Sequence, residues 1–239
     1  MGIETRILYE DEALLVCHKP AGIATQTARI GQRDMVSEVT GYLAGKQGAG
    51  RGVPYVGVIH RLDQPVEGIL VFAKDKKAAG ELSRQMAADE MGKYYQAVVC
   101  GKEIPAEGEL VDYLSKDSAA GRAIIVPEGA IAGSGAKRAV LHYKIVKTIS
   151  TEQGELSLAD IEIETGRFHQ IRAQMANAGM ALPGDEKYAD EATKTVARAL
   201  GVTSVALCAY SLAVRQPVTG KQLHFRISPA TKAFSFFDL

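Results

Sequence analysis

The sequence predicts a mixed α/β domain of the α+β class in which β-strands dominate. Many short segments are rich in β-branched and aromatic residues and are closed by Gly or Pro, a pattern typical of strands and turns. Helical spacing is confined to a few short stretches, and no repeat, low-complexity tract or long linker divides the 239 residues. We therefore expect residues 1–239 to form one domain.

Composition excludes several classes of protein. The chain is 46% hydrophobic and 23% charged, with 28 basic and 28 acidic residues, so its net charge does not indicate nucleic-acid binding, and any polyanion site must be a local patch. No apolar run approaches the ~20 residues that span a bilayer, and the N-terminus lacks a signal-peptide core, so we expect a cytoplasmic protein without membrane contact. The three isolated cysteines, Cys17, Cys100 and Cys208, are expected to be buried small residues.

The N-terminal segments predict two strands and a helix. Residues 7–17 have the pattern strand, turn, strand, and the second strand ends at Lys19. Met35, Val39 and Leu43 are spaced four apart behind Asp34, a suitable helix cap. The glycine-rich residues 45–52 lack Walker spacing and are expected to be a flexible connector.

Polar residues interrupt two apolar runs in the next segment. Val58-Ile59 and Ile69–Ala73 predict short buried strands, and the residues between them turn at Pro65 and Gly68. This turn projects His60, Arg61 and Asp63, and charged groups so close to a core make it a candidate site of chemistry.

The elements that follow are a mixture of helices and strands. They are a helix capped by Asp75, a strand over residues 93–101 that carries Tyr95, short strands and turns over 103–135, and a hairpin of residues 138–149 and 156–164. A helix over 167–178, ended by Gly179, a short helix over 193–200, and a final hairpin of 204–214 and 221–227 complete the chain.

One arginine of the 167–178 helix faces the wrong way for a surface residue. Phe168, Ile171 and Met175 form the apolar stripe at helical spacing, and Arg172 falls inside it, whereas Arg167 can point outwards. A guanidinium cannot lose its charge, so Arg172 needs a carboxylate or several carbonyl acceptors.

Taken in order, these segments resemble the RluA-type RNA pseudouridine synthases from about Ile7 to Pro229. The matching motifs are Leu15-Val16-Cys17-His18-Lys19-Pro20-Ala21-Gly22, His60-Arg61-Leu62-Asp63, Lys93-x-Tyr95-x-Ala97, Gly166-Arg167-Phe168-His169-Gln170-Ile171-Arg172, Gly184-Asp185-x-x-Tyr188 and Leu207-Cys208-Ala209-Tyr210-Ser211-Leu212. The resemblance implies the pseudouridine-synthase fold, a largely antiparallel mixed β-sheet flanked by helices and loops, with a central active-site cleft.

The chain departs from the family pattern at two places. Val66-Glu67-Gly68 stands where the family commonly has Thr-Ser-Gly, and Cys208 stands where it often has His. These departures leave the RNA target open. Because the family pattern begins near Ile7, we expect no separate N-terminal RNA-binding domain.

The resemblance implies an isomerase that converts uridines in ribosomal or transfer RNA to pseudouridine. Asp63 is then the catalytic carboxylate, as nucleophile or as base in a glycal route; Arg172 pairs with it, and Tyr95 lies against the uracil. Turn capping for Asp63, an architectural ion pair for Arg172 and core packing for Tyr95 are the structural alternatives.

The remaining candidates concern RNA binding. The target uridine must flip out of its stack, and Arg61 can hold the vacated space. His60 supports the turn, while contacts to phosphate or orientation roles are expected from Lys19, Arg167, His169 and Gln170. The reaction requires no cofactor or metal, and we expect the protein to act as a monomer.

Two other functions remain open. A non-catalytic RNA-binding or RNA-chaperone protein with the same fold would bind RNA and form no pseudouridine. A small-molecule hydrolase or glycosidase would use Asp63 together with Glu67, because glycoside hydrolysis needs two carboxylates.

Overall fold

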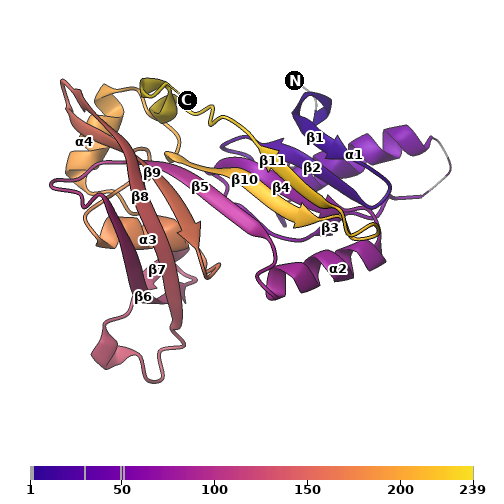
Figure 1. Ribbon diagram of the computed structural model, residues 1–239, viewed down its shortest axis with the longest axis horizontal. Coiled ribbons are helices and arrows are strands. Elements are labelled where there is room, and N and C mark those ends of the chain that lie inside the picture. Colours follow the sequence, from indigo (N-terminus) through magenta and orange to yellow (C-terminus); the bar gives the residue numbers. More distant parts are fainter. Residues whose placement is uncertain (1–2, 30, 49, 51, 239) are drawn as a thin grey trace. The chain divides into compact units, whose positions relative to one another are not determined.

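The chain forms two compact units. The computed structural model describes residues 3–29, 31–48, 50 and 52–238, shown in Figure 1. Unit 1 comprises Met1–Lys93 and Ala209–Ser228, and unit 2 comprises Tyr94–Cys208 and Pro229–Leu239. The mixed α/β class with mostly antiparallel strands is confirmed, whereas the single domain stays a prediction. No helix of the described part is long and apolar enough to cross a membrane.

The strands of unit 1 run in the order β1-β2-β4-β10, with β3 added to β4 and β11 to β10. The pairings β1–β2, β2–β4, β3–β4 and β10–β11 are antiparallel. Their bounds are β1 Ile7–Glu10, β2 Leu14–Lys19, β3 Gly57–Val58, β4 Glu67–Ala73, β10 Leu207–Arg215 and β11 Gln222–Arg226. The predicted strand, turn and strand at the N-terminus are confirmed, and Lys19 ends β2.

Strand β4 is buried along its whole length, as its unbroken apolar run predicts. It begins at Glu67, so Glu67 and Gly68 belong to the strand and the predicted turn is shorter than expected. The reason is that the β2–β4 ladder continues to the pair Lys19↔Gly68. Gly68 has φ +146°, and a Cβ there would lie 2.5 Å from the Cβ of Ala209, so this position requires glycine.

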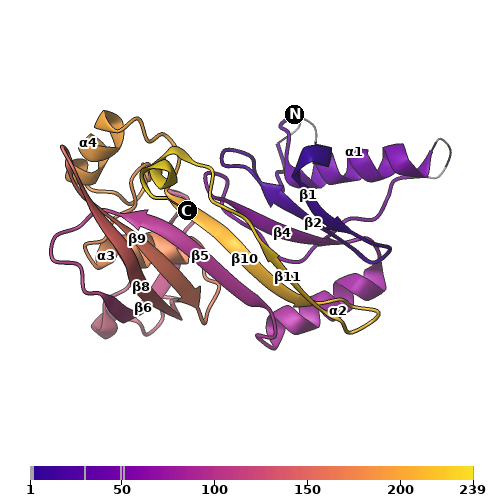
Figure 2. The same ribbon diagram turned by 45° about the horizontal axis from the view of Figure 1, so that its top comes forward.

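The α-helices described in unit 1 are α1 and α2, and Figure 2 shows them on opposite sides of β2 and β4. Helix α1 (Met35–Gln47) buries its predicted stripe of Met35, Val39 and Leu43, and Asp34 caps it by accepting a hydrogen bond from Ser37 N at 2.7 Å. It continues past Gly45, so the connector predicted over residues 45–52 begins later; residues 49 and 51 lie outside the described part. Helix α2 (Lys76–Ala87) is capped by Asp75 as predicted.

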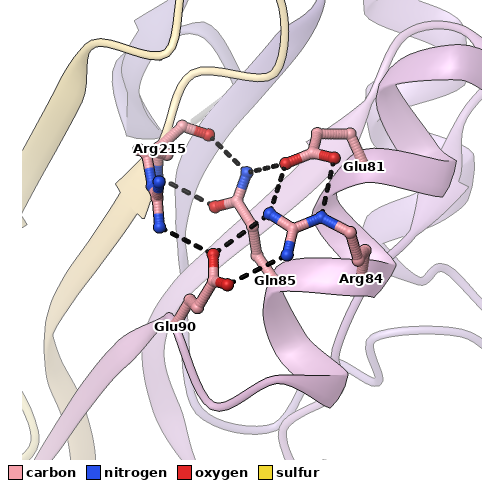
Figure 3. A network of polar contacts seen from close by, with 5 residues as sticks. All are labelled: Glu81, Arg84, Gln85, Glu90 and Arg215. Carbon is pink, nitrogen blue, oxygen red and sulfur yellow. Dashed lines mark hydrogen bonds and ion pairs between the residues drawn. The ribbon is translucent and has the colours of Figure 1, made fainter.

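A polar network joins α2 to β10 within unit 1 (Figure 3). Gln85 is fully buried; its Nε2 donates to Arg215 O at 3.0 Å, and its Oε1 accepts from Arg215 N at 3.0 Å. Around this amide, the half-exposed Arg84 donates to Glu81 and Glu90, and Arg215 also donates to Glu90. The buried Gln85 amide thus supplies hydrogen-bond partners to the backbone N and O of Arg215 in β10, while the ion pairs lie at the surface.

The strands of unit 2 run in the order β5-β9-β8-β6-β7, and α3 packs against β6 and β7 (Figure 1). The pairings β5–β9, β9–β8, β8–β6 and β6–β7 are all antiparallel. The bounds are β5 Gly92–Val99, β6 Glu107–Asp117, β7 Arg122–Ile125, β8 Lys137–Thr151 and β9 Gly154–Ile163. The hairpin predicted from residues 138–149 and 156–164 is confirmed.

Two predictions for unit 2 are wrong in their bounds. Residues 103–135 were expected to hold only short strands, but β6 has 11 residues, because pairing with the long β8 extends a segment of mixed polarity. Helix α3 is Gln170–Asn177 and starts three residues after the predicted Arg167, since His169 takes a left-handed φ of 53° that a helix cannot include. Phe168 therefore leaves the apolar stripe and is 37% exposed.

Helix α4 (Glu191–Ala199) of unit 2 starts two residues before the predicted Thr193. Asp190 caps it by accepting from Thr193 N at 2.8 Å. At the end of α3, Gly179 has φ +75° directly after the cap residue Ala178, as expected for a glycine that ends a helix.

Candidate active site

Asp63 lies in the segment between β3 and β4, and both of its neighbours are clamped to residues 20–25. Thr25 Oγ1 donates to Leu62 O at 3.0 Å and accepts from Leu62 N at 3.1 Å. Gln64 O accepts from Gly22 N at 2.9 Å, and Gln64 Nε2 donates to Gly22 O at 3.0 Å. Asp63 O then accepts from Val66 N at 3.1 Å and closes the turn. A half-buried carboxylate is thereby presented from a backbone fixed on both sides.

Lys19 is the buried cation beneath this turn. Its side chain has 0% exposure, and Nζ donates to the carbonyl oxygens of Pro20 at 3.1 Å, Ile23 at 2.7 Å and Gln64 at 3.1 Å. An ammonium has three donors, so these carbonyls use all of them. Burial lowers the pKa of Lys19 to about 8, against the opposing effect of the Asp63 and Glu67 carboxylates. The geometry assigns Lys19 to holding the turn, since a phosphate outside the fold does not reach it.

His60 supports the same turn from its other end. Its Nε2 accepts a hydrogen bond from Val71 N of β4 at 3.3 Å, which places the ring proton on Nδ1. Burial, the larger cause, and the charge of Lys93 together lower the pKa of His60 to about 4. A neutral imidazole bonded to a strand amide fits the expected supporting role. Arg61, by contrast, is exposed.

Glu67 is a buried carboxylate in β4, with 1% exposure. His18 Nε2 lies 3.6 Å from its Oε2, too far for a hydrogen bond, and this nitrogen is buried without a hydrogen-bond partner in the described part of the chain. A carboxylate at this depth is poorly placed to act on a sugar together with Asp63. This burial disfavours the glycosidase hypothesis.

Arg172 of α3 is 3% exposed, as its place in the apolar stripe predicts. Its carboxylate partner within unit 2 is Asp185: Nε donates to Oδ2 at 2.7 Å and Nη2 donates to Oδ1 at 2.8 Å. Asp185 is 1% exposed and also accepts from Lys187 N at 3.0 Å and from Tyr188 N at 3.3 Å. This two-point pair fixes the plane of the guanidinium in a dry environment.

Asp185 is the residue that the sequence reasoning missed. The motif Gly184-Asp185-x-x-Tyr188 was visible, but no role was assigned to its carboxylate. Gly184 shows why the loop takes this path: its φ is +79°, and a Cβ there would lie 2.1 Å from Ser204 O. The loop therefore passes against the backbone of residue 204, and a larger side chain would displace Asp185.

The residues at the start of α3 and just before it have three different environments. Gln170 is buried; its Nε2 donates to Val140 O at 2.9 Å, and its Oε1 accepts from Thr165 Oγ1 at 2.8 Å and Arg167 N at 2.9 Å. His169 Nδ1 lies 2.8 Å from the Tyr188 hydroxyl, and its ring stacks on Phe168 at 3.8 Å between centroids. Arg167 is exposed, and its Nε donates to Arg138 O at 2.9 Å. Gln170 thus positions the loop, and Arg167 is the member that reaches the surface.

Tyr95 lies on β5, opposite Ile161 of β9, and is 9% exposed. The structure thus brings Lys19, His60, Arg61 and Asp63 together in unit 1, and Arg167, His169, Gln170 and Arg172 in unit 2. The pairing of Asp63 with Arg172 and the approach of Tyr95 to the uracil stay predictions. Among the described residues, no three His, Cys, Asp or Glu side chains are grouped to hold a metal ion.

Sequence comparisons point to one family. Residues 13–177 match the RNA pseudouridylate synthase family. The ribosomal large subunit pseudouridine synthase D of Zymomonas mobilis is 32% identical over 227 residues, which are 93% of this chain and 68% of that protein. An uncharacterized RNA pseudouridine synthase of Bacillus subtilis is 34% identical over 185 residues, which are 77% of this chain and 58% of that protein.

Structural comparison agrees at the level of the fold. The human RNA pseudouridylate synthase domain containing 4 has a TM-score of 0.74 and 20% identity, and the match covers 98% of this chain and 93% of that one. The human RNA pseudouridylate synthase domain containing 1 has a TM-score of 0.73 and 20% identity, with 94% and 83% covered.

Proposed function

This chain belongs to the RNA pseudouridylate synthase family, whose members are isomerases, and from that premise we propose that it converts specific uridines in structured RNA to pseudouridine with Asp63 as the catalytic carboxylate. The observation that carries the proposal is the turn of Asp63. Its neighbours Leu62 and Gln64 are both hydrogen-bonded to residues 20–25, so the carboxylate is held before substrate binds.

The reaction needs no group beyond the uridine and the protein. The bond from ribose C1′ to uracil N1 breaks, and the uracil keeps the electron pair. After the ring turns, C5 bonds to C1′, C5 loses its proton, and N1 gains one. Asp63 either attacks C1′ or removes a proton from the sugar; both routes require an ionised, aimed carboxylate.

In this proposal, Arg172 and Asp185 orient the Asp63 carboxylate. A guanidinium has five N–H donors, more than one carboxylate uses, so the fork that Asp185 holds can also serve Asp63. The fixed plane of Arg172 would then set the orientation of the catalytic carboxylate. Asp185 is thus a positioning residue, because it acts through Arg172.

Tyr95 and Arg61 complete the proposed site. Tyr95 offers a ring for the uracil to stack on and a hydroxyl for proton transfer. Arg61 is exposed beside Asp63 in the sequence, and we propose that it fills the space that the flipped uridine leaves.

The test compares Asp63→Asn with Asp75→Asn. Asp63→Asn should lower pseudouridine formation by about 10⁴-fold or more, since it removes the reacting carboxylate. Asp75 caps α2 in the same unit, and Asn caps helices equally well, so Asp75→Asn should keep full activity. The substrate is total RNA from cells that lack the gene, and urea unfolding checks that both variants are folded.

The same experiment distinguishes the enzyme from the alternative, a non-catalytic protein. A non-catalytic RNA-binding protein would bind this RNA and yield no pseudouridine even as wild type. Full activity of Asp63→Asn would overturn the assignment of Asp63. Mapping the pseudouridines in the same RNA decides between ribosomal and transfer RNA as the target; the relatives named for the ribosomal large subunit favour the former.

A further inference from the structure

Three exposed cations line one hollow of unit 2. The hollow has a volume of about 290 Å³ and is formed between β6, the start of β8 and the residues before α3. Lys116, Lys137 and Arg167 contribute to its wall, and Gly135, Gly166 and Phe168 adjoin them. A water takes about 30 Å³ in the liquid, so the space admits a larger polar group.

No carboxylate balances these cations. None of the residues that line the hollow is acidic, and within the described part of the chain Lys116, Lys137 and Arg167 form no ion pair. Some other cations of unit 2 do have such partners: Lys194 and Arg198 contact Glu191, and Lys147 lies 3.8 Å from Asp238. The hollow is therefore a local basic patch on a chain of zero net charge.

Arg167 is held in place at two points. Gln170 Oε1 accepts from its backbone N, and its Nε donates to Arg138 O, so the guanidinium is oriented before any ligand arrives. Gln170 is itself anchored to Val140 O. The oriented guanidinium of this exposed residue suits the oxygens of a phosphate.

Phe168 decides which part of a nucleotide fits. Its ring stacks on His169 at 3.8 Å, and Lys116 Nζ lies over it at 4.9 Å from the centroid. With the His169 ring stacked on it and the Lys116 ammonium over it, Phe168 is already engaged and offers little open surface for a base. Instead it holds Lys116 at the hollow through a cation–π contact. The ligand chemistry is that of an anion rather than of an aromatic base.

We propose that this hollow binds the phosphodiester backbone of the RNA substrate, away from the reacting uridine, through Lys116, Lys137 and Arg167. The inference rests on the proposed function, because RNA is the polyanion that the protein must hold. It adds a site that sets affinity and register without contributing to the chemical step.

Salt dependence of RNA binding tests the site. The probe is a fluorescein-labelled RNA stem-loop with a uridine-containing loop, and its affinity for the full chain is measured by anisotropy from about 50 to about 200 mM salt. Lys137→Gln and Arg167→Gln should each weaken binding about three- to tenfold and lower the slope of log affinity against log salt by about one. The double variant should lower the slope by about two.

Lys144→Gln is the matched control. Lys144 is an exposed lysine on the same strand as Lys137 and lies outside the hollow, opposite Glu107 and Asp160. It should leave the slope unchanged. An equal loss in Lys144→Gln, or no loss in the double variant, would overturn the proposal. Competition by polyglutamate as effective as that by the RNA would also overturn it, since the hollow would then take any anionic chain.

Activity separates this proposal from the proposed function. With saturating RNA, the hollow variants should form pseudouridine at the wild-type single-turnover rate and show only a raised KM. Asp63→Asn should bind the stem-loop with the wild-type slope. If Asp63→Asn is active, the catalytic assignment of Asp63 is refuted and the phosphate site is unaffected. If Asp63→Asn is inactive but the hollow variants keep the wild-type salt slope, the phosphate site alone is refuted.

Discussion

Among the residues that the structure describes, each of the two units buries one cation, and the two cations are stabilised by different means. Lys19 of unit 1 is 0% exposed and is held by three neutral carbonyls. Arg172 of unit 2 is 3% exposed and is held by the Asp185 carboxylate through two hydrogen bonds. The carbonyls join two backbone segments, residues 20–23 and Gln64, around Lys19, whereas a carboxylate fixes the plane of the Arg172 guanidinium. The lysine organises a turn and can lose its proton; the arginine orients a charge and cannot.

The largest expected effect comes from removing Asp185. Asp185→Ala leaves Arg172 buried without this carboxylate and should lower the free energy of unfolding by about 3–5 kcal/mol. Asp190→Ala, which removes the cap of α4 close by in the sequence, should cost only about 1 kcal/mol. Urea unfolding of both variants measures the difference, and equal losses would show that the pair contributes little.

Lys19→Met should act on the turn more than on the fold. It leaves Pro20 O and Ile23 O without their ammonium donor, while Gln64 O keeps the hydrogen bond from Gly22 N. We expect a loss of about 1–3 kcal/mol in unfolding free energy. Pseudouridine formation should fall about 100-fold because the clamp on Asp63 loosens. Lys19→Arg should not restore it, since a planar fork does not match three carbonyls around one point. Wild-type activity in Lys19→Met would refute the clamp.

The pH dependence of stability distinguishes the two cations further. The pKa of Lys19 is lowered from 10.5 to about 8 in the fold, so the unfolded chain binds this proton more tightly. Between about pH 8 and 10.5, wild type should therefore gain stability relative to Lys19→Met, by about 1 kcal/mol per pH unit. Below pH 8 the difference should be flat. Urea unfolding at several pH values measures it, and a difference that shrinks with rising pH would show that the carbonyls outweigh desolvation.

The smallest effect is expected where a cation is exposed. Arg84 donates to Glu81 and Glu90 at the surface of α2, and Arg84→Ala should leave the melting temperature nearly unchanged (Figure 3). Gln85, one residue away and fully buried, is the contrast. Gln85→Ala removes partners from Arg215 N and O and should cost about 1–3 kcal/mol. Thermal melting measures both variants. A larger loss of stability in Arg84→Ala than in Gln85→Ala would show that the exposed ion pairs contribute more than the buried amide.

Local spacing was sufficient to predict several features of the fold. Asp34 and Asp75 cap their helices, β4 is buried on both faces, and Arg172 faces inwards, because each depends on residues within one or two turns or one strand. The end of α3 at Gly179 follows the same rule. The start of α3 does not, since the left-handed His169 is kept by its stacking on Phe168 and its bond to Tyr188.

Partners distant in sequence could not be predicted in this way. Thr25 clamps Leu62 from 37 residues away, and Gln85 reaches Arg215 across 130 residues. β6 is long because β8 pairs with it. The spacing of residue types along the sequence does not predict these contacts, because the path of the folded chain decides which backbone groups meet.

By itself, then, the sequence determined that the charge of Arg172 must be buried within an apolar stripe, and it placed the charge of Asp63 in a turn and that of Lys19 at a strand end, each within a family motif. Only the tertiary structure decided what stabilises those charges, three carbonyls for Lys19 and Asp185 for Arg172. The physical reason is that the side chain that must be buried is set by its neighbours in the sequence. The acceptor that makes its burial possible is set by how the chain folds back on itself.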